Sequence, residues 1–98
     1  MKSAFKTDSL GQYAELKVGE TKDYGNDFTT ELGADIIISS AWSTTLTTTS
    51  SSITGGITSV FFSGAVDGGS YWVDNSVITA GGRTLKESFR LIGKTRTP

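Results

Sequence analysis

In the second half of the chain, a short apolar run at residues 60–64 is followed, from residue 71 to residue 92, by residues whose side chains alternate between two faces. The clearest run begins at Tyr71. On a strand, one face would carry Tyr71, Val73, Asn75 and Val77, and the opposite face would carry Trp72, Asp74, Ser76 and Ile78. A period of two residues over this length predicts a β-strand. Glycine pairs at residues 68–69 and 81–82 predict tight turns on either side of it. The pattern therefore predicts three consecutive antiparallel strands.

The first half of the chain predicts further short strands. Strand-favouring residues gather at residues 13–18, 23–32 and 36–43, with turn residues between them. Residues 45–49 predict one more strand, then a loose Ser-rich link and a turn at Gly55 and Gly56; a low-complexity linker is the alternative. No helix of any length is predicted. About seven short strands in 98 residues predict a single all-β domain folded as a two-sheet β-sandwich.

The inward positions of these strands define the predicted core. The parity that brings Trp42 inward does the same for Ile36, Ile38 and Ser40, and leaves Ile37 facing the other way. Asn75 shares the inward parity of its strand, so its amide needs hydrogen-bond partners, and we expect it to hold a neighbouring loop. The residues expected in the core are Phe28, Trp42, Phe62, Tyr71, Val73, Asn75 and Phe89, with Leu32, Ile36, Ile38, Val60, Val77 and Leu91 beside them.

The composition excludes most kinds of catalytic site. The chain has no Cys and no His, so it lacks a thiol, a Cys-ligated zinc site and the usual general base near neutral pH. Asp23 and Asp27 would lie about 13 Å apart on a strand, too far for a glycosidase pair. Asp67 and Asp74 flank a turn, where cation binding is the alternative to ordinary solvation. We therefore predict no catalytic residues, no metal site and no cofactor.

Charge and hydropathy exclude further partners. A net charge of -1 with mixed signs offers no basic face for nucleic acid. No apolar run approaches the ~20 residues that cross a bilayer, and residues 1–12 lack the apolar core of a signal peptide. We expect no nucleic-acid, membrane or small-molecule partner.

Residues 1–12 are polar, and we expect them to form an N-terminal arm beside a sandwich domain of residues 13–98. We expect the arm to lie along a partner; a disordered start is the alternative. Trp72 faces outward beside Ile78, where a large aromatic is either packed across strands or an interface anchor. The expected interface residues are Phe5, Leu10, Tyr13, Trp72 and Ile78.

Several short motifs stand out between residues 20 and 91. They are Glu20-x-x-Asp23-Tyr24-x-x-Asp27-Phe28, Leu32-Gly33 with the Ile-rich strand that ends in Trp42, Ser63-Gly64, Gly69-x-Tyr71-x-Val73-x-Asn75, Ile78-Thr79, Gly82-Arg83-Thr84 and Ser88-Phe89. Together they resemble the phage fibre–tail adaptor proteins. The resemblance implies an immunoglobulin- or fibronectin-III-like β-sandwich with an extended N-terminal arm.

The same resemblance implies a non-enzymatic structural protein, made in the host cytoplasm and built into the tail of a bacteriophage virion. There it would join the tail tube or nozzle to fibres or spikes, as a symmetric ring of copies. A capsid decoration or cement protein on the head shell is one alternative. A carbohydrate- or receptor-binding module that stacks its ligand on Trp72, Tyr71 and Trp42 is the other.

Overall fold

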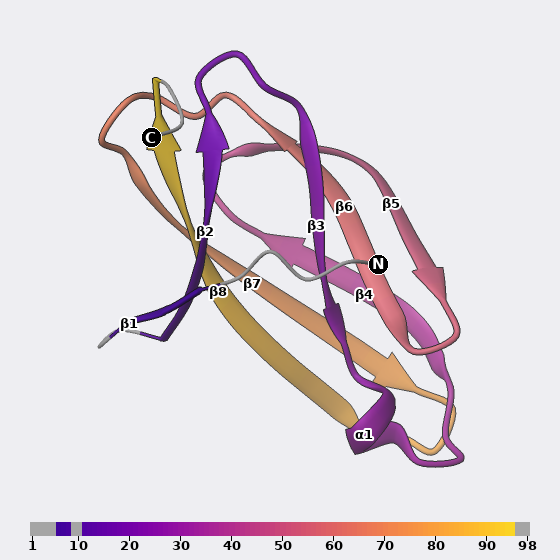
Figure 1. Cartoon of the computed structure of the whole chain (residues 1–98). Coiled ribbons are helices and arrows are strands. Elements are labelled where there is room, and N and C mark those ends of the chain that lie inside the picture. The colour runs from indigo at the N-terminus through magenta and orange to yellow at the C-terminus, as the bar shows by residue number, and fades with distance from the viewer. Residues whose placement is uncertain (1–5, 9–10, 96–98) are drawn as a thin grey trace.

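The computed structural model describes residues 6–8 and 11–95, which fold into two β-sheets packed face to face (Figure 1). The predicted two-sheet sandwich is confirmed. The described strands are β1 (Lys6–Asp8), β2 (Gly11–Lys17), β3 (Lys22–Asp27), β4 (Ile37–Ser43), β5 (Thr47–Thr54), β6 (Ile57–Ser63), β7 (Ser70–Thr79) and β8 (Thr84–Lys94).

The prediction of no helix is wrong for one turn, α1 (Thr29–Leu32), which follows β3. The Oδ1 atom of Asp27 accepts hydrogen bonds from the N–H of Thr29 at 2.9 Å and from its hydroxyl at 2.6 Å. These bonds lower the pKa of Asp27 and turn the chain out of β3. The turn buries Leu32 at one end of the sandwich.

Sheet A has five strands, in the order β1-β2-β8-β7-β4. β7 and β8 form a long antiparallel hairpin, from Ser70 opposite Ile92 to Ile78 opposite Thr84. β2 pairs with β8 in parallel, whereas the other described pairs in this sheet are antiparallel. β2 begins at Gly11, two residues before the strand expected at residues 13–18.

Sheet B has three strands, in the order β3-β6-β5. β5 continues through the Ser-rich segment by pairing with β6, so the loose link expected there is wrong. The pairing is irregular between Thr49 and Ser52, and Ser50 takes a positive φ of 54°. Gly25 of β3 must lack a side chain, because a Cβ atom there would lie 1.7 Å from the carbonyl oxygen of Thr58.

An aromatic cluster fills the space between the sheets. Trp42, Phe62 and Phe89 meet edge to face, with ring centroids 5.9 to 6.4 Å apart, the favourable geometry for aromatic pairs. Phe62, Phe89 and Val73 are fully buried, while Trp42 and Tyr71 are partly buried at the margin of the same cluster. A second cluster of buried residues, nearer α1, consists of Phe28, Leu32 and Val77.

Asn75 is fully buried between the sheets, and its amide is saturated with hydrogen bonds. Its Nδ2 donates to Oγ of Ser40 at 2.9 Å and to the carbonyl of Ala41 at 3.0 Å. Its Oδ1 accepts from Nδ2 of Asn26 at 3.1 Å and from the hydroxyl of Thr58 at 2.6 Å. The expectation that Asn75 holds a loop is wrong, because these partners lie in β3, β4 and β6. The residue instead ties the two sheets together.

The inward parity predicted for the start of β4 is also wrong. The pairing of β4 with β7 shifts between Ile37 and Ser39, so that Ile38 is an extra residue in a β-bulge. Ile37 packs against the cluster of Phe28, Leu32 and Val77. Ile36 and Ile38, both expected in the core, are 62% and 60% exposed.

Asp35, just before β4, joins that strand to the turn between β7 and β8. Its Oδ2 accepts a hydrogen bond from Arg83 at 3.2 Å, and its Oδ1 accepts one from the N–H of Gly81 at 2.9 Å. Arg83 also donates to the carbonyl of Leu32 at 3.1 Å, which brings α1 into the same network. The hydroxyl of Thr79, followed by backbone N–H groups and Arg83, lowers the pKa of Asp35 to about 2.

Candidate interaction surface

Outward-facing residues of three adjacent strands meet on the outer face of sheet A. Arg90 of β8 lies opposite Tyr13 of β2 on one side and opposite Trp72 of β7 on the other. Its guanidinium lies 5.6 Å from the centre of the Tyr13 ring and 5.7 Å from the centre of a ring of Trp72, within the range of cation–π attraction. Arg90 is 7% exposed, whereas Trp72 is 50% exposed. Tyr13, Arg90 and Trp72 form an aromatic stack, which holds the indole of Trp72 with about half of its surface exposed to solvent.

The structure thus brings together two of the expected interface residues, Tyr13 and Trp72. Arg90 between them was not expected from the sequence. The contact of Arg90 with Tyr13 depends on the parallel pairing of β2 with β8, two strands from opposite ends of the chain. The only signal for it in the sequence is that Arg90 occupies an outward position of its strand. Phe5 and Leu10 lie outside the described residues.

Ile78 lies at the other end of β7. It is six positions along the strand from Trp72, or about 20 Å at strand spacing, so the expectation that the two lie side by side is wrong. Ile38 occupies the bulge in β4 across from Ile78 and Thr79, and the carbonyl of Ile36 accepts a hydrogen bond from the N–H of Ala80. Ile36, Ile38 and Ile78, which we call the isoleucine patch, lie at this end of sheet A, and each is between 47% and 62% exposed.

The surface between the aromatic stack and the isoleucine patch is polar. A shallow hollow of about 380 Å³ is lined by residues 41–43 of β4, residues 74–76 of β7, and Lys86 and Ser88 of β8. The hydroxyl of Ser88 donates to Asp74 inside it. The outer face of sheet A therefore presents two apolar areas separated by a polar one.

The two carboxylates considered for a cation are engaged within the chain. Asp67 accepts a hydrogen bond from the N–H of Thr95 at 3.0 Å, and Asp74 accepts one from Ser88. Residues 6–8 and 11–95 contain no group of three or more side chains that could hold a metal ion. Over the same residues, no helix is long and apolar enough to cross a membrane.

The family of the chain follows from a comparison with models of protein families. The family described as "Podophage GP4 fiber-tail adaptor protein gp77" matches residues 17–92. The chain belongs to this family. The adaptor is therefore a structural, non-enzymatic protein of the phage virion, and its place is the tail. A search of curated proteins found no match.

The family match confirms the resemblance found in the sequence and covers nearly the whole sandwich of the adaptor. Trp72, Arg90 and the isoleucine patch lie inside the matched residues. β1 and β2 as far as Leu16 lie outside them, and so does Tyr13. As a fibre–tail adaptor, the protein binds tail and fibre proteins.

Proposed function

We propose that the adaptor works as a ring of copies joined through the outer face of sheet A. The observation that carries the proposal is Trp72, half exposed and held over Arg90 on that face. The isoleucine patch adds a second apolar area on the same face. Monomers rarely leave large apolar areas in water, and Trp, Tyr and Arg are the residues that most often dominate interfaces.

Copies in a ring meet head to tail, so this face must fit a different surface of the next copy. The N-terminal arm, residues 1–12, is the surface we propose. β1 and the start of β2 form one edge of sheet A, beside Tyr13. We place Phe5 and Leu10 of the arm, with Tyr13, Trp72 and Ile78, in the contact between copies.

We further propose that the sandwich is immunoglobulin-like. Sheet B groups β3, β6 and β5, while sheet A groups β4, β7 and β8, which is the strand grouping of an immunoglobulin domain. Trp42 lies on β4 against the aromatic core, where such domains keep a Trp. The hydroxyl of Tyr71, at the start of β7, accepts a hydrogen bond from the N–H of Val66 at 3.0 Å, which resembles their tyrosine corner.

In this arrangement the ring contacts the tail tube or nozzle on one side and fibres or spikes on the other. The protein is made in the host cytoplasm before it enters the virion.

The variant Trp72→Ala tests whether copies of the adaptor assemble through the outer face of sheet A. The variant should fold, because it loses mainly a cation–π contact worth about 0.5–1 kcal/mol. Assembly, measured by size-exclusion chromatography with light scattering, should weaken, since truncating an interface Trp often costs about 2 kcal/mol or more. Phe61→Ala is the matched control, because Phe61 is a 38% exposed aromatic on sheet B. A Trp72→Ala protein that assembles like the wild type would contradict the proposal.

A further inference from the structure

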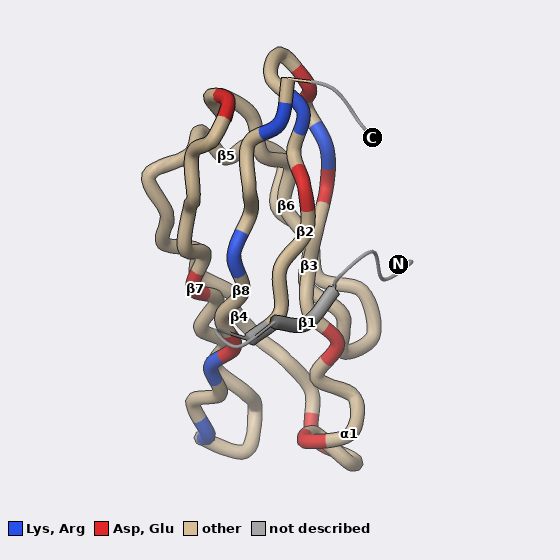
Figure 2. Tube along the Cα trace, turned by 60° about the vertical axis from the view of Figure 1, so that its left-hand side comes forward, with Lys and Arg blue, Asp and Glu red and all other residues tan. Residues whose placement is uncertain are grey.

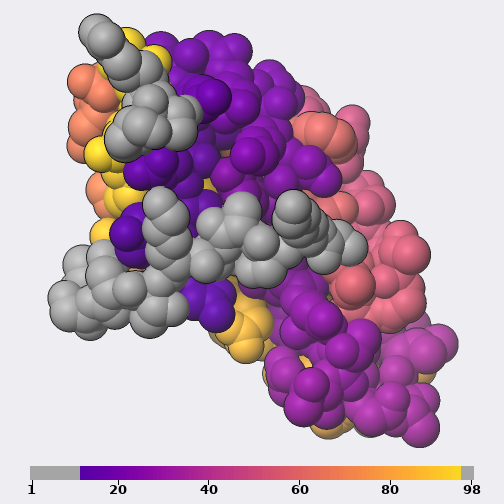
Figure 3. All heavy atoms as spheres, in the orientation of Figure 1, coloured from indigo at the N-terminus to yellow at the C-terminus, as the bar shows by residue number. Residues whose placement is uncertain are grey.

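Charged residues are distributed unevenly over the molecule. Residues 36–66 contain no Asp, Glu, Lys or Arg, and this stretch includes the whole of β4, β5 and β6. Fifteen of its 31 residues are Ser or Thr. Figure 2 shows charged positions on β2, β3, β7 and β8, on α1 and in the turns. Figure 3 shows β5 and β6, in pink, along one flank of the molecule. A partner that contacts only β4, β5 and β6 meets no charged side chain.

β4 and β5 are both edge strands, since β4 ends sheet A and β5 ends sheet B. Edge strands present unpaired backbone N–H and C=O groups, which proteins usually protect with charged residues or proline. β3, the other edge of sheet B, carries Lys22, Asp23 and Asp27. β4 and β5 carry no charge and no proline, and every residue of β5 is exposed. The side of the sandwich formed by these two strands, the β4–β5 flank, is therefore open to another strand.

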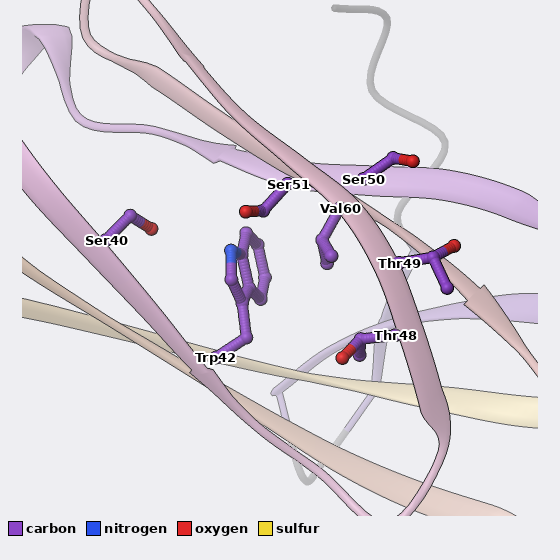
Figure 4. Close-up of a pocket in the computed structure, with 7 residues that line it drawn as sticks. All are labelled: Ser40, Trp42, Thr48, Thr49, Ser50, Ser51 and Val60. Carbon is purple, nitrogen blue, oxygen red and sulfur yellow. The ribbon is translucent and has the colours of Figure 1, made fainter.

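A cavity of about 250 Å³ lies between β4 and β5 (Figure 4). It is lined by Ser40 and Trp42 of β4, residues 48–51 of β5 and Val60 of β6. The indole of Trp42 projects from β4 towards Ser51 (Figure 4). The indole N–H is buried and has no hydrogen-bond acceptor within the described part of the chain. A buried donor of this kind is unfavourable, so a partner that supplies an acceptor would gain affinity.

We propose that the β4–β5 flank binds the tail fibre. An uncharged, extended segment of the fibre adds to β5 as a further strand, and one of its oxygen-bearing side chains accepts a hydrogen bond from the indole N–H of Trp42. The lack of charge selects such a segment, because a charged one would be buried without an ion partner. This inference rests on the adaptor function, which requires a fibre site apart from the contact between copies. The flank lies wholly within residues 17–92, the part matched by the adaptor family.

The test measures binding of the phage's purified tail fibre to the full-length adaptor by biolayer interferometry. Ser51→Lys places a charge in the cavity and should weaken binding at least about tenfold. Trp42→Phe removes the N–H but keeps an aromatic ring, and should weaken binding about threefold or more. Thr21→Lys adds the same charge to an exposed residue beside β3, the opposite edge of sheet B, and should leave binding unchanged. Thermal unfolding checks that each variant folds.

Hydrogen–deuterium exchange on the wild-type adaptor gives a readout that needs no variant. Fibre binding should slow exchange in β5, because an added strand pairs its free backbone groups. Equal binding by Ser51→Lys, or protection confined to the outer face of sheet A, would overturn the assignment. If Ser51→Lys loses the ring and keeps the fibre, the flank is a contact between copies and the assignment is wrong. A wild-type ring that does not bind the fibre overturns the adaptor function itself, and this site with it.

Discussion

Asn75 uses every donor and acceptor of its amide inside the core, so both sheets depend on one side chain. Asn75→Ala removes the Oδ1 atom that accepts hydrogen bonds from the hydroxyl of Thr58 and from Nδ2 of Asn26. Each buried polar group left unpaired costs about 1–3 kcal/mol. We expect the free energy of unfolding in urea to fall by about 3 kcal/mol or more. Asn26→Ala is the control, because it removes only one of the four bonds and should cost about 1 kcal/mol. An equal decrease in the free energy of unfolding for Asn75→Ala and Asn26→Ala would show that the hydrogen-bond network is not centred on Asn75.

Asp35 makes the fold sensitive to acid. Its pKa is lowered from 3.8 to about 2 in the folded chain, so the unfolded chain takes up a proton at a higher pH than the folded chain does. The stability that this carboxylate contributes is therefore complete above about pH 4 and is lost as the pH falls towards 2. Asp35→Asn should reduce the dependence of the free energy of unfolding on pH in this range, measured at about pH 5 and about pH 2.5. An unchanged dependence would contradict this role.

At the level of whole elements, alternation predicted the faces of β7 but failed at the start of β4. The odd-numbered positions of β7 are mostly apolar, whereas its Asp and Ser residues occupy even-numbered positions together with Trp72 and Ile78, so a single register fits its sequence. Residues 36–38 are all Ile, which leaves the local pattern compatible with either face. The packing of Ile37 against Phe28, Leu32 and Val77 decides the register, and no neighbouring residue signals that contact.

Because of the bulge in β4, we expect alanine substitutions of two adjacent isoleucines, Ile37 and Ile38, to change the free energy of unfolding by different amounts. Ile37→Ala removes a side chain packed against the core cluster near α1 and should lower the free energy of unfolding by about 2 kcal/mol or more. Ile38→Ala changes an exposed residue and should alter it by less than about 0.5 kcal/mol. Urea unfolding of the two variants measures the difference. A larger loss for Ile38→Ala would mean that the originally expected register is correct.

Over the whole molecule, we propose two different surfaces for the two contacts of the adaptor. The outer face of sheet A carries exposed aromatic and isoleucine residues, and the β4–β5 flank carries free strand edges without charge. The outward direction of Trp72 and Ile78 followed from local parity. The approach of Arg90 to Tyr13, and the cavity beside Trp42, could not be predicted, because both depend on how distant strands meet.

We propose that the adaptor forms a ring in the virion between the tail and its fibres. Cryo-microscopy of the intact phage is the decisive experiment, because the sandwich can be located within the particle. The predicted result is a ring of sandwiches at the tail, with the outer face of sheet A against the next copy and the β4–β5 flank against a fibre. Sandwiches on the head shell, or single copies without contact to fibres, would contradict the claim.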